Sequence, residues 1–496
     1  MLRAERMTDS PRPLREFMDP LLTLSGTRLA RMIRSREVSS RDVVEAHIRQ
    51  VQQVNPALNA MVETRFEQAR QEALEADERV AREDPEGLPP LLGVPCSIKE
   101  AFAFEGMPNT SGLVSRKGVR ATHDATAVRR LREAGAIPLG VTNISELCMW
   151  MESDNNVYGR TNNPYDQRCT VGGSSGGEGA IIAAGGSPFG LGSDVGGSIR
   201  LPAFFNGVFG HKPTGGLIPN TGQFPIAHNE ARRYLTTGPL CRRAEDLYPL
   251  VRILAGPDGQ DLCIDTPLQD PSSVSLRRLT VIDVADNGVV DVSDDLREAQ
   301  RRAGDALAAA GARVRRVRIP GLRRSLQIWS AMLEAAGGPT FAELMGGGDA
   351  IHPEHELLRW MTFQSPHTLP AIGLALLEQV PKLIPSGASK FVEVGLALRK
   401  ELVERIGPNG VMLYPSYATP APRHVKPLLP PLRWIYTAII NAMEMPSTQV
   451  PLGLNRHGLP LGVQVVATHG NDHLGLAVAM ELERAFGGWV PPELGN

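Results

Sequence analysis

The sequence predicts an α/β fold in which helices cover both faces of a large, twisted, mixed β-sheet. Short apolar runs typical of buried strands alternate with helical segments along the chain, as α/β folds require. Of the 496 residues, 42% are hydrophobic, so the chain can bury a sizeable core. The sequence shows neither an internal repeat nor a long linker, and residues 1–496 are therefore expected to form a single domain.

The N-terminal part predicts two helices before the first buried strand. Ser39–Asp42 has the pattern of a capping box that opens an amphipathic helix running to about Val54. A charged helix is expected around Arg65–Arg82. Leu91–Ile98 is a short apolar run that predicts a buried strand, which would place Lys99 at the C-terminal end of that strand.

The same alternation continues along the chain. Asp124 is expected to cap a helix that ends at Gly135, and a strand is expected at Ala136–Val141. Later elements are expected as strand, helix and strand at Leu279–Val284, Asp294–Ala310 and Ala312–Val317, and as strands at Val411–Tyr414 and Leu461–Val466. The stretch of about 320–407 is helical in pattern and is expected to form a cap or an insertion.

Composition limits the classes of partner and compartment. The net charge is −2, so nothing indicates nucleic acid as a partner. The five cysteines form no CxxC pair, and an odd, scattered set is typical of reduced thiols in a cytoplasmic protein. The N-terminus lacks an apolar run of signal-peptide length, and no stretch reaches 18 apolar residues. We expect a cytoplasmic protein with a small-molecule substrate and no transmembrane anchor.

Three segments carry the chemistry, and they contain Lys99, Ser174 and Ser198. A lysine and two glycine-flanked serines suffice for acyl transfer without histidine. Ser198 is expected to attack, Lys99 to act as the base, and Ser174 to relay the proton between them. Burial of the Lys99 stem would lower its pKa, as a base at neutral pH requires. Glu100 is the next residue on the strand, so its side chain is expected on the opposite face.

Glycines next to Ser198 predict a site for a developing negative charge. Two glycines before a serine let the backbone turn tightly, so that successive N–H groups converge on one point. The expected oxyanion-hole donors are the N–H groups of Val195, Gly196, Gly197 and Ser198. Around them, Ser175 is expected to hydrogen-bond within the site, and Asp194 and Arg200 are expected to hold the loop.

Two other kinds of site fit parts of the sequence. Gly172-Gly-Ser174-Ser-Gly176 also matches the nucleophile elbow of α/β-hydrolases, which needs an acid and a histidine downstream. Histidines are available for that role, although none lies in a recognisable motif: His211, His228, His352 and His355. The His352 and His355 pair also has metal-ligand spacing, but Pro353 breaks the helix that such a pair needs. We expect no metal and no organic cofactor.

The three segments around Lys99, Ser174 and Ser198 resemble the amidase signature family. Further segments similar to that family are Thr142–Glu146, Tyr158–Pro164, Leu201–Gly207, Gly210–Pro213 and Gly458–Gln464. The resemblance implies the amidase-signature fold, a Ser–Ser–Lys triad, a cis peptide bond before Ser174 and catalysis without a cofactor.

We therefore expect an amidohydrolase that cleaves hydrophobic acyl amides through an acyl-enzyme. Candidate walls of the acyl pocket are Met149, Trp150, Met151, Phe204, Phe205 and the apolar helix Ala371–Leu377, each of which could equally be core packing. The segment Leu369–Ile384 is expected to be a cap or a homodimer surface. Alternative functions are an aryl-acylamidase, a carbamate or ester hydrolase, a glutaminase-type amidotransferase subunit, and a catalytically silent scaffold.

Overall fold

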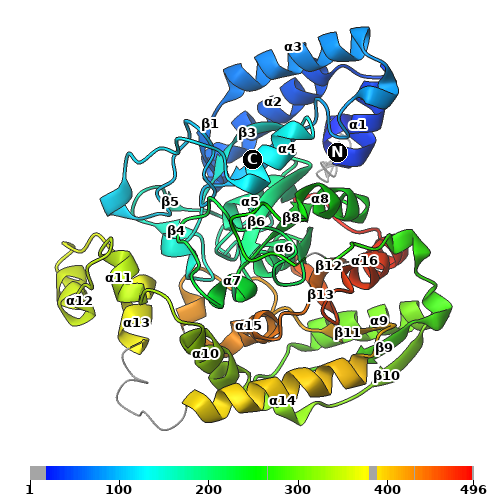
Figure 1. Cartoon of the computed structure of the whole chain (residues 1–496). Coiled ribbons are helices and arrows are strands. Elements are labelled where there is room, and N and C mark those ends of the chain that lie inside the picture. The colour runs from blue at the N-terminus through cyan, green and yellow to red at the C-terminus, as the bar shows by residue number, and fades with distance from the viewer. Residues whose placement is uncertain (1–17, 265, 379–387, 429–430, 494–496) are drawn as a thin grey trace, which may run out of the picture.

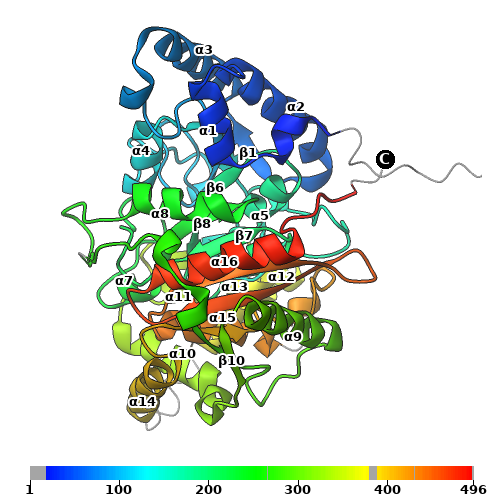
Figure 2. The ribbon, with the colours of Figure 1, turned by 90° about the vertical axis from the view of Figure 1, so that its right-hand side faces the viewer.

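The computed structural model describes residues 18–264, 266–378, 388–428 and 431–493. As predicted, the fold is α/β, with one mixed sheet of 11 strands between layers of helices (Figure 1, Figure 2). In order across the sheet the strands are β1 (Met61–Thr64), β3 (Ile137–Thr142), β2 (Pro95–Lys99), β6 (Phe189–Asp194), β8 (Thr236–Cys241), β7 (Phe209–Lys212), β12 (Ser447–Leu454), β13 (Pro460–Ala467), β11 (Gly410–Tyr414), β9 (Thr280–Asp283) and β10 (Arg313–Arg316). A separate small sheet pairs β4 (Asp154–Asn155) with β5 (Gly159–Arg160).

Strand direction positions the site. β2 runs parallel to both of its neighbours, β3 and β6. Ser97 pairs with Gly190 in this register, and Lys99 and Asp194 are the last residues of β2 and β6. The carboxyl ends of parallel strands meet at one edge of a sheet, so the two ionisable side chains emerge near each other. Ligand sites of α/β folds commonly form at this edge.

Helices pack on both faces of the sheet. Outside residues 320–407, the described helices of six or more residues are α1 (Gly26–Arg34), α2 (Ser40–Leu58), α3 (Phe66–Arg82), α4 (Thr126–Glu133), α5 (Gly176–Ala183), α6 (Arg200–Phe205), α8 (Leu247–Leu254), α9 (Asp294–Ala309), α15 (Ile435–Ala442) and α16 (Asp472–Phe486). Consecutive strand residues point to opposite faces. On β12, Thr448 faces Gly475 of α16, whereas Gln449 shares its face with Phe204 of α6. The two helices therefore lie on opposite faces of the sheet.

The N-terminal helices differ in detail from the expectation. Ser39 does cap α2, because its hydroxyl accepts a hydrogen bond from the Asp42 N–H at 3.0 Å. The helix then continues through Pro56 to Leu58, beyond the expected end near Val54. Its apolar face stays buried in these last residues, and that burial stabilises the extra turn.

The expectation that Asp124 caps a helix is wrong. α4 begins at Thr126, and its N-cap is Ala125, which makes no side-chain capping bond. The Asp124 carboxylate instead accepts the Glu105 N–H at 2.9 Å and pairs with Arg132 at 2.6 Å. The Glu105 N–H and the Arg132 side chain thus bind the carboxylate that would otherwise cap the helix.

The expected helical cap consists of α10 (Ser325–Ala336), α11 (Phe341–Met345), α12 (Pro353–Met361), α13 (Leu369–Leu377) and α14 (Ala388–Ile406). Part of it has a small apolar core of its own, which also contains Leu113 and Leu147 from the body of the protein. Residues 379–384 of the expected cap or dimer segment lie outside the described residues. Among the helices of the described part of the chain, none combines the length and the apolarity needed to cross a bilayer.

Candidate active site

Lys99 and Ser174 meet in the interior of the protein. Lys99 ends β2, and Ser174 lies in the turn before α5. The Lys99 Nζ donates a hydrogen bond to Ser174 Oγ at 2.7 Å and another to Ser193 Oγ at 3.0 Å. Both Lys99 and Ser174 are fully buried. The Gly173–Ser174 peptide bond is cis, as the family resemblance implied.

The surroundings of Lys99 favour its neutral form. Burial lowers the pKa of the Lys99 amine below its ordinary value, although the nearby Cys148, Asp194 and Glu178 side chains oppose this shift. Burial raises the pKa of the Glu178 carboxyl to about 7, against the hydrogen bonds that Ser97 and Thr142 donate to it. Because the Glu178 carboxyl is then partly protonated at neutral pH, it stabilises a positive charge on Lys99 only weakly.

Glu100 does not pair with Lys99, as expected for the next residue on a strand. Its carboxylate accepts hydrogen bonds from the N–H groups of Thr110 and Ser111 and from the hydroxyl of Tyr158. These bonds tie a buried loop together on the other side of β2. The carboxylate therefore has a structural role and leaves the lysine amine to the serines.

Ser198 lies between β6 and α6, at the more open side of the lysine–serine pair. It is 9% exposed, whereas Lys99 and Ser174 have no exposed surface. The backbone joins the two serine segments, because the Ser175 N–H donates to the Ser198 carbonyl at 3.2 Å. Within the described residues, the Ser198 hydroxyl makes no hydrogen bond, so it is free to face a substrate.

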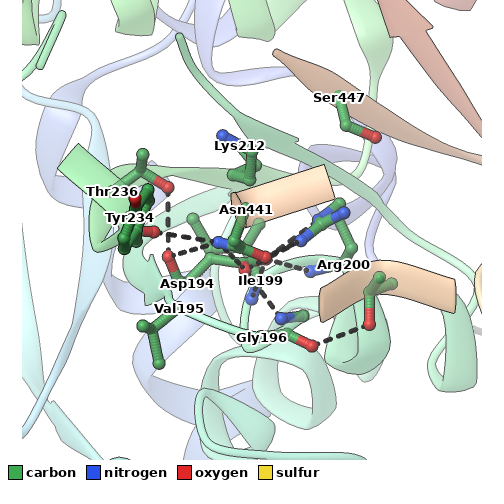
Figure 3. Close-up of polar contacts among 12 residues, drawn as sticks. Asp194, Val195, Gly196, Ile199, Arg200, Lys212, Tyr234, Thr236, Asn441 and Ser447 are labelled. Carbon is green, nitrogen blue, oxygen red and sulfur yellow. Dashed lines mark hydrogen bonds and ion pairs between the residues drawn. The ribbon is translucent and has the colours of Figure 1, made fainter. Parts of the chain in front are cut away.

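Asp194 organises the loop that carries Ser198 (Figure 3). Its carboxylate accepts the Gly197 N–H at 2.7 Å and the Ile199 N–H at 3.0 Å. It also forms a fully buried ion pair with Arg200, at 2.9 Å. Burial alone would raise the pKa of this carboxyl, but the Arg200 guanidinium holds it below its usual range. Asp194 and Arg200 thus hold the loop, as the sequence predicted.

The Gly197 N–H is therefore not free to bind an oxyanion, which corrects the expected set of four donors. A carboxylate three residues earlier in the chain takes this N–H. Within the described part of the chain, the N–H groups of Val195, Gly196 and Ser198 have no acceptor. Three of the four expected donors therefore remain available at the loop.

The residues expected to form the acyl pocket divide into two groups. Met149 and Trp150 are half-buried, and Met149 packs against the apolar core of the cap. Met151 is buried, with its sulfur 4.0 Å from the Tyr417 hydroxyl. Phe204 and Phe205 are 0% and 1% exposed and pack in the main core, which is the alternative that the sequence left open for them. Their positions on α6 turn them toward the sheet and Tyr417.

Among the described residues, no histidine hydrogen-bonds to Ser174 or Ser198. His211 is buried, and its two ring nitrogens lie 2.9 Å from Thr448 Oγ1 and 3.1 Å from Asp472 Oδ1. His352 and His355 lie close together, with ring centroids 5.2 Å apart. Among the described residues, no group of three or more His, Cys, Asp or Glu side chains has the arrangement of a metal site. Ser174 has the Lys99 amine where a nucleophile elbow would have a histidine.

Some residues of the site were not expected from the sequence. Ser193 and Glu178 contact or surround Lys99, and both lie inside the glycine-rich motifs, which was the available signal. Thr437 and Asn441 bind the nucleophile loop from α15. They lie one helical turn apart, but nothing in their local sequence indicates a contact with a loop more than 200 residues earlier.

Fold and site together define a hydrolase that cleaves amide C–N bonds. The chain belongs to the amidase family, whose sequence pattern matches residues 42–476. It is 48% identical to fatty-acid amide hydrolase 2 of Homo sapiens, over 97% of this chain and 92% of the human protein. It is also 48% identical to fatty-acid amide hydrolase 2-A of Danio rerio, over 96% of this chain and 91% of the fish protein.

Solved structures agree with this assignment. The chain is similar to 6-aminohexanoate cyclic dimer hydrolase in complex with its substrate, with a TM-score of 0.77 and 28% identity. The match covers 96% of this chain and all of that structure. The 11-stranded sheet and its helical layers are therefore those of an amidase-signature enzyme.

Gly197→Ala should disrupt the nucleophile loop. Gly197 has φ +126°, and a Cβ added there would lie 2.2 Å from Thr437 Oγ1. Backbone strain alone costs about 1–3 kcal/mol, and a displaced loop should lower kcat by about 100-fold. Urea unfolding and amidase assays measure the two effects. For stability the matched control is Gly196→Ala, whose Cβ would make only ordinary contacts, the nearest at 3.6 Å. Equal unfolding free energies for the two variants would contradict this account.

Proposed function

We propose that this enzyme hydrolyses amides with hydrophobic acyl groups, with Ser198 as nucleophile, Ser174 as proton relay and Lys99 as base. The proposal depends chiefly on the fully buried 2.7 Å hydrogen bond between Lys99 Nζ and Ser174 Oγ. Burial lowers the pKa of the Lys99 amine, and in its neutral form this amine can take a proton from the Ser174 hydroxyl that it holds.

In the proposed reaction, Ser198 Oγ adds to the acyl carbon while its proton passes to Ser174 and the Ser174 proton passes to Lys99. The carbonyl π electrons move to oxygen, and the N–H groups of Val195, Gly196 and Ser198 stabilise the oxyanion. Collapse of this intermediate breaks the C–N bond, and Lys99 returns the proton to the leaving nitrogen through Ser174. Water then adds to the acyl-enzyme by the same relay and releases the carboxylic acid and Ser198.

A hydrophobic acyl group is supported by the side of the site that carries Met149 and Trp150. Both side chains are half-buried, Met149 against the apolar core of the cap and Trp150 against the main core. The names of the fatty-acid amide hydrolase 2 relatives point to the same substrate class. Phe204 and Phe205 pack in the main core, so the proposed acyl site does not include them. Aryl amides, carbamates and esters share the attacked carbonyl and are competing substrates.

We propose that residues 1–496 form one domain, because a single sheet contains strands from β1 to β13. We also propose a cytoplasmic location, which the five free cysteines support. A homodimer that uses the cap is a further proposal, and light scattering would test it.

Initial rates on primary amides of increasing acyl length test the proposed substrate class. Each methylene buried in an apolar pocket contributes about 0.8 kcal/mol, so kcat/KM should rise about fourfold per methylene until the pocket is full. Glutamine should be a poor substrate, and an ester and an aryl carbamate of matched acyl size serve as comparisons. A flat dependence on chain length, or fastest turnover of glutamine, would refute the hydrophobic-acyl proposal.

Lys99→Ala should lower amide hydrolysis by about 10²- to 10⁴-fold, because it removes the proposed base. Ester hydrolysis should fall less, since an alkoxide needs less protonation to leave. In the wild type, the neutral amine exists above the Lys99 pKa, so activity should rise with pH and level off above that pKa. Because burial lowers the pKa, the midpoint of the rise should lie below pH 10.5.

The pH dependence of kcat/KM is measured for the wild type and for Lys99→Ala. The matched control is Lys117→Ala, because Lys117 is exposed. The Lys99 variant should lose the ascending limb, and the control should keep it. If the Lys99 variant kept the limb, or lost amide and ester activity equally, Lys99 would not be the base.

A further inference from the structure

Residues from β8, α15 and α10 donate hydrogen bonds to the carbonyl groups of the nucleophile loop, which runs from Asp194 to Ser198. The Asp194 carbonyl accepts hydrogen bonds from Thr236 Oγ1 on β8, at 3.2 Å, and from Asn441 Nδ2 on α15, at 2.9 Å (Figure 3). The Gly196 carbonyl accepts one from Thr437 Oγ1, at 2.8 Å. In a trans peptide, the carbonyl and the following N–H point in opposite directions. Each of these bonds therefore also sets the direction of one N–H of the loop.

The Val195–Gly196 peptide has a different anchor. The Val195 carbonyl accepts a hydrogen bond from the indole Nε1–H of Trp329 at 3.3 Å. In the described part of the chain, this indole is the one donor to that carbonyl, whereas the Asp194 carbonyl has two. Gly196 has no side chain to restrict its rotation, so the position of this peptide depends on the indole hydrogen bond.

A second tryptophan packs against Trp329. The Trp329 and Trp434 rings pack edge to face, with centroids 4.9 Å apart at an angle of 82°. Both rings lie against Gly196, because a Cβ added there would be 3.6 Å from Trp434 and 3.8 Å from Trp329. Both side chains are half-buried. The two indoles therefore pack on one side of the Val195–Gly196 peptide, and the Gly196 N–H points away from Trp329.

We propose that Trp329 is a positioning residue of the oxyanion hole, which fixes the Gly196 N–H by holding the Val195 carbonyl. The inference rests on the proposed role of this loop in amide hydrolysis. Trp329 lies on α10, within the helical cap, so the cap contributes directly to stabilisation of the oxyanion. The hydrogen bond forms with the loop and not with substrate, and its effect should therefore fall on the reaction barrier more than on substrate binding.

Trp329→Phe keeps an aromatic ring and removes the N–H donor. It should lower kcat on a long-chain amide by about 10- to 100-fold with KM nearly unchanged, the range expected for a displaced or lost oxyanion donor. The inhibition constant of a trifluoromethyl ketone with the same acyl group should rise by the factor by which kcat/KM falls, because that ketone forms an oxyanion at Ser198. The ascending limb of the pH profile should stay in place, because Lys99 and Ser174 are not altered.

The matched control is Trp434→Phe, which makes the same ring change beside Gly196 but removes no hydrogen bond to the loop within the described residues. It should lose much less kcat and much less affinity for the ketone. Incorporation of 3-benzothienylalanine at position 329 replaces the N–H by sulfur in a ring of the same shape, and it should reproduce the loss seen for Trp329→Phe without a change in melting temperature.

Three outcomes would overturn the proposal: equal losses in the two phenylalanine variants, a rise in KM alone, or full activity of the benzothienyl enzyme. Wild-type turnover in the same assays tests the proposed function separately. If the wild type cleaves long-chain amides while Trp329→Phe matches its control, the role of Trp329 fails and the proposed function stands.

Discussion

A lysine can act as a base only in its neutral form, and in this fold burial shifts the Lys99 amine toward that form. Lys99 ends a central strand with no exposed surface, and burial lowers its pKa. Neighbouring carboxyls could restore the positive charge, but each is engaged elsewhere. Asp194 is paired with Arg200, and burial raises the pKa of Glu178 to about 7. The amine is therefore left to the serine hydroxyls, on which the proposed relay depends.

The second requirement is a rigid nucleophile loop, and residues far apart in the chain meet it together. Asp194 holds the loop from within, through the Gly197 and Ile199 N–H groups. β8, α15 and the cap helix α10 hold its carbonyls from outside. The carbonyl groups of the loop are thus bound by the protein, and the N–H groups that lack a partner among the described residues are left for the proposed substrate. If Trp329 has its proposed role, amide hydrolysis and the packing of α10 are linked through the same short stretch of backbone.

Local sequence patterns predicted the strands β2, β3, β9, β11 and β13 and the pairing of Lys99 with Ser174, because apolar runs and glycine-flanked serines are local signals. They did not predict β8, whose Gly238 and Pro239 are unusual in a central strand. Asp124 failed as a cap because Arg132 and the Glu105 N–H bind it. Gly197 failed as a donor because Asp194 takes its N–H. The Trp329, Thr437 and Asn441 contacts depend on tertiary packing, which no local pattern encodes.

The identity of the covalently modified residue tests the central claim most directly. The native enzyme would be treated with a long-chain fluorophosphonate, digested, and analysed by mass spectrometry for the site of the adduct. The Ser–Ser–Lys account predicts phosphonylation of Ser198 in the wild type and loss of labelling in Ser198→Ala. Phosphonylation of Ser174, in the wild type or after that substitution, would contradict the account and favour a nucleophile elbow at Gly172–Gly176.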